Sequence, residues 1–242
     1  MKPKKALSQN FLVDDAVVNA FVDAACVAAG ETIVEIGPGY GAITKALLKK
    51  GAHVLGIEID PHLAKKLKAP NLEIVEGDAL TFDYTRHPTN KVVANLPFQI
   101  ATPLIIKLIQ LPFNSITIMI QKEVGESLIA QPSTSAYSPI TLQTQNLCAA
   151  RYLFTVPSSA FHPQPKIEAA AIQLIPHPPL YSLDMQFVAC AFRQRRKMLK
   201  SALKDTYPEI KNVMQDLNLD LTARAENLTL EEFAKLYNKL FA

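Results

Sequence analysis

Four consecutive residues, Asn95-Leu96-Pro97-Phe98, combine groups that can hold a flat ring carrying an amine. They follow the apolar run 92–94, which is typical of a buried strand. The Asn95 amide oxygen accepts hydrogen bonds, and Pro97 keeps Leu96 extended, which fixes the Leu96 carbonyl. Phe98 offers an aromatic face for stacking. Two acceptors beside an aromatic face suit the exocyclic amine of a nucleobase. The alternative interpretation is a strand end followed by a turn.

A glycine-rich stretch at residues 37–41 lies between a predicted strand at 32–36 and a predicted helix at 42–50. A second strand at 53–57 leads into Glu58, about 20 residues after Gly37, the distance at which an acid reaches a ribose diol. This order predicts a βαβ unit that binds a nucleotide, with glycines that let the backbone approach the ligand. The G-x-G-x-G spacing and Pro38, which has no N–H, favour an adenosine ligand without a diphosphate. Tight helix–strand packing is the alternative.

Two further residues are candidates for recognition of a base. Asp78 follows a predicted strand at 72–75 and can accept a hydrogen bond from an adenine amine held at the strand ends. A helix cap or turn is the alternative for Asp78. Phe161 lies in a loop that Pro163 and Pro165 rigidify. We interpret Phe161 either as a second aromatic wall for a base or as a hydrophobic plug under the loop.

Composition limits the remaining possibilities. The chain has 242 residues, 49% of them hydrophobic, which is enough for one large and one small domain with a full core. Its 25 Lys and Arg residues nearly balance its 22 Asp and Glu residues, so nucleic-acid binding requires local clustering of charge. Three dispersed cysteines indicate a reducing compartment, and neither they nor the five histidines show metal-ligand spacing. We read no membrane span and no signal peptide, and we expect a cytoplasmic protein.

The remaining elements follow from apolar runs and from the turn-forming and loop-forming residues between them. Residues 130–139 are rich in Ser, Thr and Pro and predict a loop, and residues 176–182 predict a linker. The pattern after the linker is helical, and it ends in a helix at 228–240 with Thr229 and Glu232 as a capping box. The predicted strands lie at residues 32–36, 53–57, 72–75, 92–95, 116–120, 147–156 and 169–175.

The helical C-terminal part carries five positive charges within eight residues. Such a run predicts phosphate binding, and the alternative is a solvated helix face. The run consists of Arg193, Arg195, Arg196, Lys197 and Lys200.

Short motifs follow one another along almost the whole chain. They are Gln9-Asn10-Phe11-Leu12, Glu35-Ile36-Gly37-Pro38-Gly39, Glu58-Ile59-Asp60, Gly77-Asp78-Ala79, Asn95-Leu96-Pro97-Phe98, Gln121-Lys122-Glu123-Val124, Phe161-x-Pro163-x-Pro165-Lys166, Gln194-Arg195-Arg196-Lys197 and Arg224-Ala225-Glu226-Asn227-Leu228. This ordered set resembles the KsgA family of small-subunit ribosomal RNA adenine dimethyltransferases, which depend on S-adenosylmethionine.

The resemblance implies an α/β fold: a Rossmann-like class I methyltransferase sheet of seven mostly parallel strands with a small all-helical C-terminal domain. The methyltransferase domain would span residues 1–178 and the RNA-binding helical domain residues 179–242. The implied activity is dimethylation of the N6 amines of two adjacent adenosines in the 3′-terminal hairpin loop of 16S ribosomal RNA, during ribosome biogenesis. The implied partner is the assembling small subunit, and no metal is implied.

The resemblance also implies site residues. Those matching the target-adenine motifs are Asn95, Leu96, Pro97 and Phe98, with Phe161 as a second aromatic. Those matching the S-adenosylmethionine motifs are Asn10, Leu12, Gly37, Gly39, Glu58, Asp78 and Asn95.

The chain departs from the family pattern at a few places. Phe98 stands where the family usually has Tyr, so stacking is kept and a hydroxyl contact is lost. Leu7-Ser8 replaces a Phe-Gly pair, and the loop at 131–139 offers Gln131, Ser135 and Ser138 where a Lys and a Gly are usual.

Other classes of protein compete with this interpretation. A resistance dimethyltransferase acting on large-subunit ribosomal RNA shares the fold and the Asn-x-Pro-aromatic motif, but the motifs at 161–166 and 195–197 favour the small subunit. A non-catalytic ribosome assembly factor is disfavoured because residues 95–98 and the glycine loop are intact. DNA adenine and protein glutamine methyltransferases typically carry Asn-Pro-Pro here. We expect a monomer, because no apolar surface stripe is left over.

Overall fold

The computed structural model describes residues 10–87 and 89–241, so the motif residue Gln9 and the Leu7-Ser8 departure lie outside the described residues. The chain forms two compact units. The sheet unit consists of residues up to Gly125 together with Cys148–Pro176, and the helical unit of Glu126–Leu147 together with residues from His177 onward. The division predicted at residues 178 and 179 took no account of the segment 126–147. That segment joins the helical unit because its apolar side chains share the core of the C-terminal helices.

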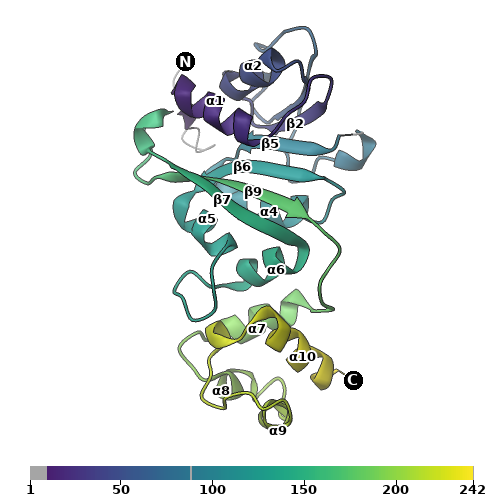
Figure 1. Cartoon of the computed structure of the whole chain (residues 1–242), viewed down its shortest axis with the longest axis vertical. Coiled ribbons are helices and arrows are strands. Elements are labelled where there is room, and N and C mark those ends of the chain that lie inside the picture. Colours follow the sequence, from purple (N-terminus) through teal and green to yellow (C-terminus); the bar gives the residue numbers. More distant parts are fainter. Residues whose placement is uncertain (1–9, 88, 242) are drawn as a thin grey trace. The chain divides into compact units, whose positions relative to one another are not determined.

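The sheet unit is organised around seven strands in the order β4-β3-β2-β5-β6-β9-β7. Neighbouring strands from β4 to β6 pair in parallel, and β9 runs antiparallel to both β6 and β7. The predicted sheet of seven mostly parallel strands is therefore confirmed (Figure 1). The strands are β2 (Thr32–Ile36), β3 (His53–Glu58), β4 (Leu72–Glu76), β5 (Lys91–Asn95), β6 (Ser115–Gln121), β7 (Cys148–Val156) and β9 (Ala169–Pro176).

The central strands were recognisable because they are buried on both faces. The first six residues of β6 are all buried, and four of them, Ile116, Ile118, Met119 and Ile120, are apolar, as in a strand that is covered on both faces. Helices α1 (Asp15–Ala24) and α2 (Ala42–Lys49) contribute Phe21 and Leu47 to one core cluster with Val93 of β5. The Asp14 side chain accepts from two backbone N–H groups at the start of α1, as an N-cap should. The sheet unit also holds α3 (Pro61–Ala64) and α4 (Ala101–Leu108), and α5 (Lys122–Leu128) begins in it.

A two-stranded ladder that the sequence did not predict ties the start of the described chain to the loop at 161–162. In it β1 (Phe11–Leu12) pairs antiparallel with β8 (Phe161–His162), and Leu12 lies opposite Phe161. Strands of two residues are too short to show a periodic pattern. The short 3-10 helices in the described part of the chain are Tyr84–Arg86, Phe98–Ile100, Ser158–Ala160 and Ala225–Asn227.

The helical unit packs around a core of aromatic and aliphatic side chains. Phe187, Phe192 and Phe233 are buried there, and Tyr137 joins them from the 126–147 segment. The predicted capping box is present, with Thr229 and Glu232 bonded reciprocally. The unit contains α6 (Pro139–Leu147), α7 (Met185–Phe192), α8 (Leu199–Leu203), α9 (Ile210–Asp216) and α10 (Leu230–Leu240). None of the helices in the described part of the chain has the length and hydropathy that a membrane span requires.

Candidate active site

A pocket lies at the carboxyl ends of the parallel strands. The chain runs outward from β2 through β3 to β4 on one side and from β5 to β6 on the other, so the strand order reverses between β2 and β5. Ligands of open α/β sheets bind at such a switch point. The predicted residues that line this pocket are Asn10, Leu12, Gly37, Gly39, Glu58, Asp78, Asn95, Leu96, Pro97 and Phe98.

The glycine loop shapes one wall of the pocket. Gly39 has a φ of +59°, and a Cβ at this position would lie 2.9 Å from Cδ1 of the Phe11 ring. Glycine is therefore required at residue 39 both by the backbone conformation and by the close approach of Phe11. The Phe11 ring in turn contacts the ring of Tyr40, with 4.4 Å between ring centroids. Tyr40 lines the pocket and is partly exposed, and the sequence had not marked it as a site residue.

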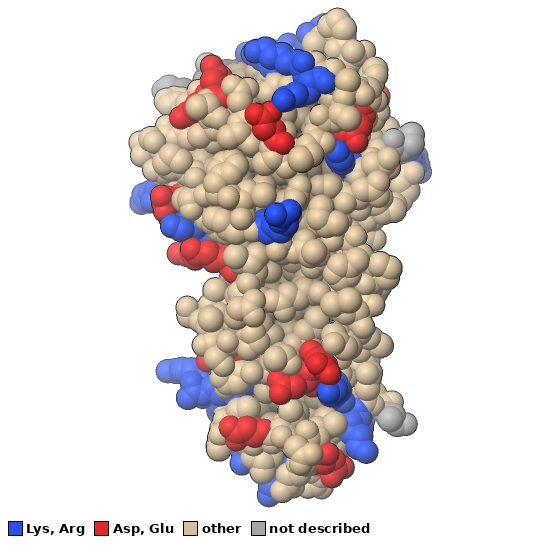
Figure 2. All heavy atoms as spheres, in the orientation of Figure 1, with Lys and Arg blue, Asp and Glu red and all other residues tan. Residues whose placement is uncertain are grey.

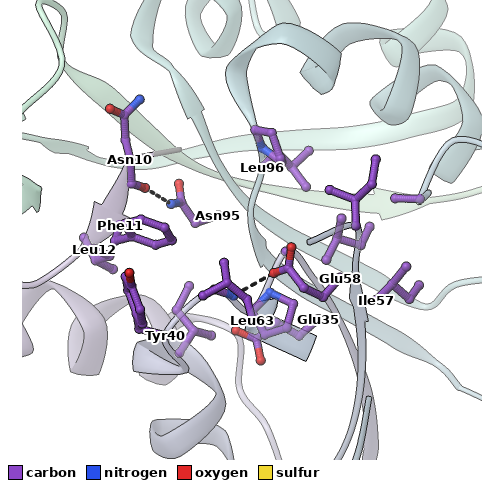
Figure 3. Close-up of a pocket in the computed structure, with 18 of the residues that line it drawn as sticks. Asn10, Phe11, Leu12, Glu35, Tyr40, Ile57, Glu58, Leu63, Asn95 and Leu96 are labelled. Carbon is purple, nitrogen blue, oxygen red and sulfur yellow. Dashed lines mark hydrogen bonds between the residues drawn. The ribbon is translucent and has the colours of Figure 1, made fainter. Parts of the chain in front are cut away.

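Glu58 ends β3 with its carboxylate already held by the backbone. Its Oε2 accepts from the N–H of Gly39 at 3.0 Å (Figure 3). Its Oε1 accepts from the N–H of Asp60 at 2.9 Å. Burial raises the pKa of Glu58, and these hydrogen bonds oppose that effect. The acid predicted to reach a ribose is thus placed at the pocket and fixed in orientation.

Glu35 is a second buried acid on the pocket wall, and the predicted site did not include it. Its side chain is 1% exposed, and its Oε2 accepts from the Thr44 hydroxyl at 2.6 Å. Burial, and to a smaller extent the nearby Glu58, raises the pKa of Glu35 to about 8. An acid inside an otherwise apolar strand was the signal in the sequence, because a carboxyl group is rarely buried without a partner.

We expect replacement of Glu35 by glutamine to flatten the dependence of stability on pH. The folded pKa of about 8 lies above the ordinary value of 4.5, so between these values only the folded chain holds the proton. The stability from this group is complete below pH 4.5 and is lost as the pH rises through 8, at up to about 1.4 kcal/mol per pH unit. Glutamine stays neutral and still offers an oxygen to Thr44. Urea unfolding between about pH 5 and 9 measures the slope, and equal slopes for both proteins would contradict the assignment.

The Asn95 amide is oriented by the backbone of β1. Its Nδ2 donates to the carbonyl of Asn10 at 3.2 Å (Figure 3). A carbonyl accepts only, so the amide nitrogen must face Asn10 and the amide oxygen must face away from it. Asn95 Oδ1 is buried, with no hydrogen-bond partner among the described residues. Such an atom in a pocket wall is an acceptor ready for a ligand donor.

The residues after Asn95 are held in place as well. The Leu96 N–H donates to the carbonyl of Met119 on β6 at 2.9 Å, and Leu96 is buried. Pro97 has a φ of −59° and lies 3.9 Å from the place where a Cβ of Gly37 would stand. Phe98 is partly buried against the core and lines the pocket. The glycine loop and the tetrapeptide at 95–98 therefore meet in one rigid corner.

Phe161 does not line the pocket. It is 3% exposed, belongs to the core cluster that includes Phe21, and pairs through its backbone with Leu12. The Phe161 ring therefore packs in the core beneath the loop, as the second of its two interpretations expects.

The basic run covers the turn between α7 and α8 and ends at Lys200, the second residue of α8. Arg193, Arg196 and Lys197 are exposed, and Lys200 is half-buried. Figure 2 shows side chains of both signs on the visible face of the helical unit, so a basic site there depends on this local cluster.

Arg195 differs from its neighbours because its guanidinium is bonded within the helical unit. Its Nη2 donates to the carbonyls of Ser135 and Tyr137 at 3.1 and 3.0 Å and to the Glu226 carboxylate at 3.0 Å. These contacts hold the loop at 131–138 to the segment 224–227. Residues 10–87 and 89–241 contain no group of three or more His, Cys, Asp or Glu side chains suited to a metal ion.

The sheet and its pocket define a Rossmann-like methyltransferase. A dimethyladenosine transferase from Plasmodium falciparum has a TM-score of 0.83 and 25% identity, with 96% of this chain and 98% of that chain covered. The 23S rRNA methyltransferase ErmE, with a TM-score of 0.73 and 24% identity over 96% of this chain and 100% of its own, shares the fold.

The chain belongs to the ribosomal RNA adenine dimethylase family, whose sequence model matches residues 1–241. Similar proteins include the ribosomal RNA small subunit methyltransferase A of Paracoccus denitrificans, 40% identical over 261 residues that cover 100% of this chain and 93% of the relative. The protein of the same name from Chlamydia felis is 37% identical over 255 residues, which cover 98% of this chain and 90% of the relative. The family resemblance seen in the motifs is thereby confirmed.

Proposed function

We propose that this chain transfers methyl groups from S-adenosylmethionine to the N6 amines of two adjacent adenosines in the 3′-terminal hairpin loop of 16S ribosomal RNA. The observation that carries the proposal is the buried, unpaired Oδ1 of Asn95, an acceptor in the pocket wall whose partner is absent from the described residues. The relatives named as small-subunit ribosomal RNA methyltransferases support the choice of substrate.

The pocket fits S-adenosylmethionine, which supplies a methyl group already activated by a positively charged sulfur. Glu58 has a fixed carboxylate suited to a ribose diol, and Asp78 offers an acceptor for the adenine amine. The Glu58 carboxylate, which accepts from the Gly39 N–H at the glycine loop, disfavours an anion such as a diphosphate. Asn10, Leu12, Gly37 and Gly39 complete the wall that would hold the cofactor.

The tetrapeptide at 95–98 would act on the target adenine. Asn95 Oδ1 and the Leu96 carbonyl accept the two hydrogens of the amine, which favours a pyramidal nitrogen whose lone pair is free of the ring. Phe98 stacks on the base after it leaves its place in the RNA. Alignment of reacting groups supplies ~7–11 kcal/mol of a barrier, so these residues act mainly by positioning.

The test is methyl transfer from labelled S-adenosylmethionine to small ribosomal subunits from cells that lack the modification. Large subunits are assayed alongside, and the nucleosides of the digested RNA are separated. Dimethyladenosine from small subunits alone is the expected result. Label in large subunits would favour the resistance class of enzyme instead. Bound cofactor without label in either subunit would overturn the proposal and favour a non-catalytic assembly role.

We propose that the exposed Arg193, Arg196 and Lys197 and the half-buried Lys200 contact RNA phosphates, and that Arg195 holds the loop at 131–138. Replacing Arg196 with alanine should weaken binding to small subunits and reduce the slope of log K against log salt by about 0.7–0.9, the value for one phosphate contact. Replacing Arg195 with alanine should lower the melting temperature and leave the slope unchanged. Binding titrations at several salt concentrations measure both, and an unchanged slope for the Arg196 variant would favour a solvated turn.

The setting proposed for this reaction is the cytoplasm, with the enzyme acting as a monomer on the assembling small subunit. The three cysteines, all free in the structure, fit a reducing compartment.

A further inference from the structure

One lysine in the sheet unit is bonded almost wholly to backbone carbonyls. Helix α4 reads ATPLIIKL, and Lys107 is its one charged residue. The Lys107 ammonium donates to the carbonyls of Leu80 and Phe82, each at 2.7 Å, and to that of Ala79 at 3.4 Å. It also lies 4.9 Å from the centre of the Tyr84 ring. An ammonium group has three donors, and here each of them finds a carbonyl.

These carbonyls belong to the turn after β4, residues 78–82, which we call the acidic turn. The turn closes on Asp78, whose backbone carbonyl accepts from the N–H groups of Thr81 and Phe82 at 3.0 and 2.9 Å. The Asp78 carboxylate also accepts from the Leu80 N–H at 2.8 Å through Oδ1. The first residues of the turn line the cofactor pocket, and its carbonyls meet Lys107.

The ammonium has a specific effect on this turn. Three carbonyl oxygens around one point repel each other unless a cation lies between them, and hydrogen bonds from a charged donor are about twice as strong as neutral ones. The Tyr84 hydroxyl adds a bond to the Ala79 carbonyl at 2.9 Å. The helix itself does not depend on the ammonium, because Leu104, Ile105 and Leu108 anchor it in the core. Loss of the ammonium should therefore loosen the turn and leave α4 in place.

We propose that Lys107 is a positioning residue for the cofactor: it holds the acidic turn in the conformation that presents Asp78 to the pocket. The inference rests on the proposed function, in which Asp78 accepts from the adenine amine of S-adenosylmethionine. Lys107 touches neither cofactor nor substrate in this role. Its removal should raise the dissociation constant of the cofactor and leave the rate at saturating cofactor near normal.

The test compares Lys107→Met with a matched variant, Lys91→Met. The Lys91 ammonium also donates to a backbone carbonyl, that of Cys26 at 2.7 Å, and to the Glu31 carboxylate at 2.9 Å. It stands at the first residue of β5, so it lies at the end of that strand away from the pocket. Calorimetric titration with S-adenosylmethionine should show a dissociation constant raised about tenfold for Lys107→Met and by less than about twofold for Lys91→Met. Lys107→Arg, which keeps charge and donors, should recover most of the affinity.

A double-mutant cycle with Asp78→Ala separates positioning from general destabilisation. If Lys107 acts through Asp78, the Asp78→Ala change should weaken cofactor binding less in the Lys107→Met background than in the wild type. Three results would overturn the inference. The effects of Lys107→Met and Asp78→Ala on the binding free energy could be fully additive. Lys107→Met could bind the cofactor with wild-type affinity, or Lys107→Met and Lys91→Met could lose the same amount of affinity. An Asp78→Ala protein that binds the cofactor normally would instead overturn the role proposed for Asp78. If Lys107→Met does not fold, Lys107→Gln, which loses the charge and keeps an N–H donor, takes its place in the cycle, and full additivity with Asp78→Ala would again overturn the inference.

Discussion

Replacing Asn95 with alanine is expected to lower the rate of methyl transfer by about 10²–10³-fold, the effect of removing one preorganised polar group from an active site. The fold should survive, because the change removes a buried oxygen that has no partner among the described residues and one long hydrogen bond to Asn10. Single-turnover methylation of small subunits measures the rate, and thermal unfolding checks the fold.

A buried asparagine of the helical unit provides the control. Asn146 Oδ1 accepts from the Tyr181 N–H at 2.9 Å, and its Nδ2 donates to the Tyr181 carbonyl at 3.1 Å, so both ends of the amide are used within the protein. Replacing Asn146 with alanine should lower the melting temperature and leave the chemical step nearly unchanged. Near-normal turnover of the Asn95→Ala protein would remove Asn95 from the mechanism.

A carboxylate at residue 95 tests the orientation of the amide. Aspartate keeps an oxygen in the place of Oδ1 but sets a second oxygen against the Asn10 carbonyl, where Asn95 has its donor. The two oxygens repel, so β1 and the side chain should separate. We therefore expect the Asn95→Asp protein to be as inactive as the alanine variant in the same single-turnover assay, although it keeps an acceptor.

Much of this site was predictable because parallel strands bring their carboxyl ends to one edge of the sheet. Glu58, Asp78 and Asn95 each end or follow an apolar run, so their meeting in one pocket follows from the strand order alone. The glycine loop was predictable from the local pattern, because a strand precedes it and a helix follows it. The cap at Thr229 was local and therefore easily recognised.

Contacts between distant segments were not predictable. Pairing of β1 with β8 joins residues about 150 positions apart through four residues, which leave no periodic signal. Arg195 was grouped with its basic neighbours, because the sequence does not show that the carbonyls of Ser135 and Tyr137 would surround its guanidinium. The polar helix α6 was missed because its Gln, Thr and Asn residues resemble a loop, although tertiary packing makes it a helix.

The second large effect is expected from Gly39→Ala. The new Cβ would lie 2.9 Å from Phe11, and the residue would have to keep a φ of +59°. Gly30→Ala is the control, because Gly30 has a φ of +81° and nothing within 4 Å of its Cβ position. Both variants bear the backbone cost of about 1–2 kcal/mol, and only Gly39→Ala also displaces an aromatic ring.

That displacement should reach the reacting group, because Phe11 is the neighbour of Asn10 and the Asn10 carbonyl orients the Asn95 amide. Gly39→Ala should therefore raise the dissociation constant of S-adenosylmethionine about tenfold or more and also lower the rate at saturating cofactor. Gly30→Ala should lower the melting temperature alone. Titration calorimetry and single-turnover assays measure the two effects.

Adding Phe11→Leu to Gly39→Ala makes room for the Cβ and should restore part of the affinity. Failure of that rescue would mean that backbone strain at residue 39, and not the contact with Phe11, disables the pocket.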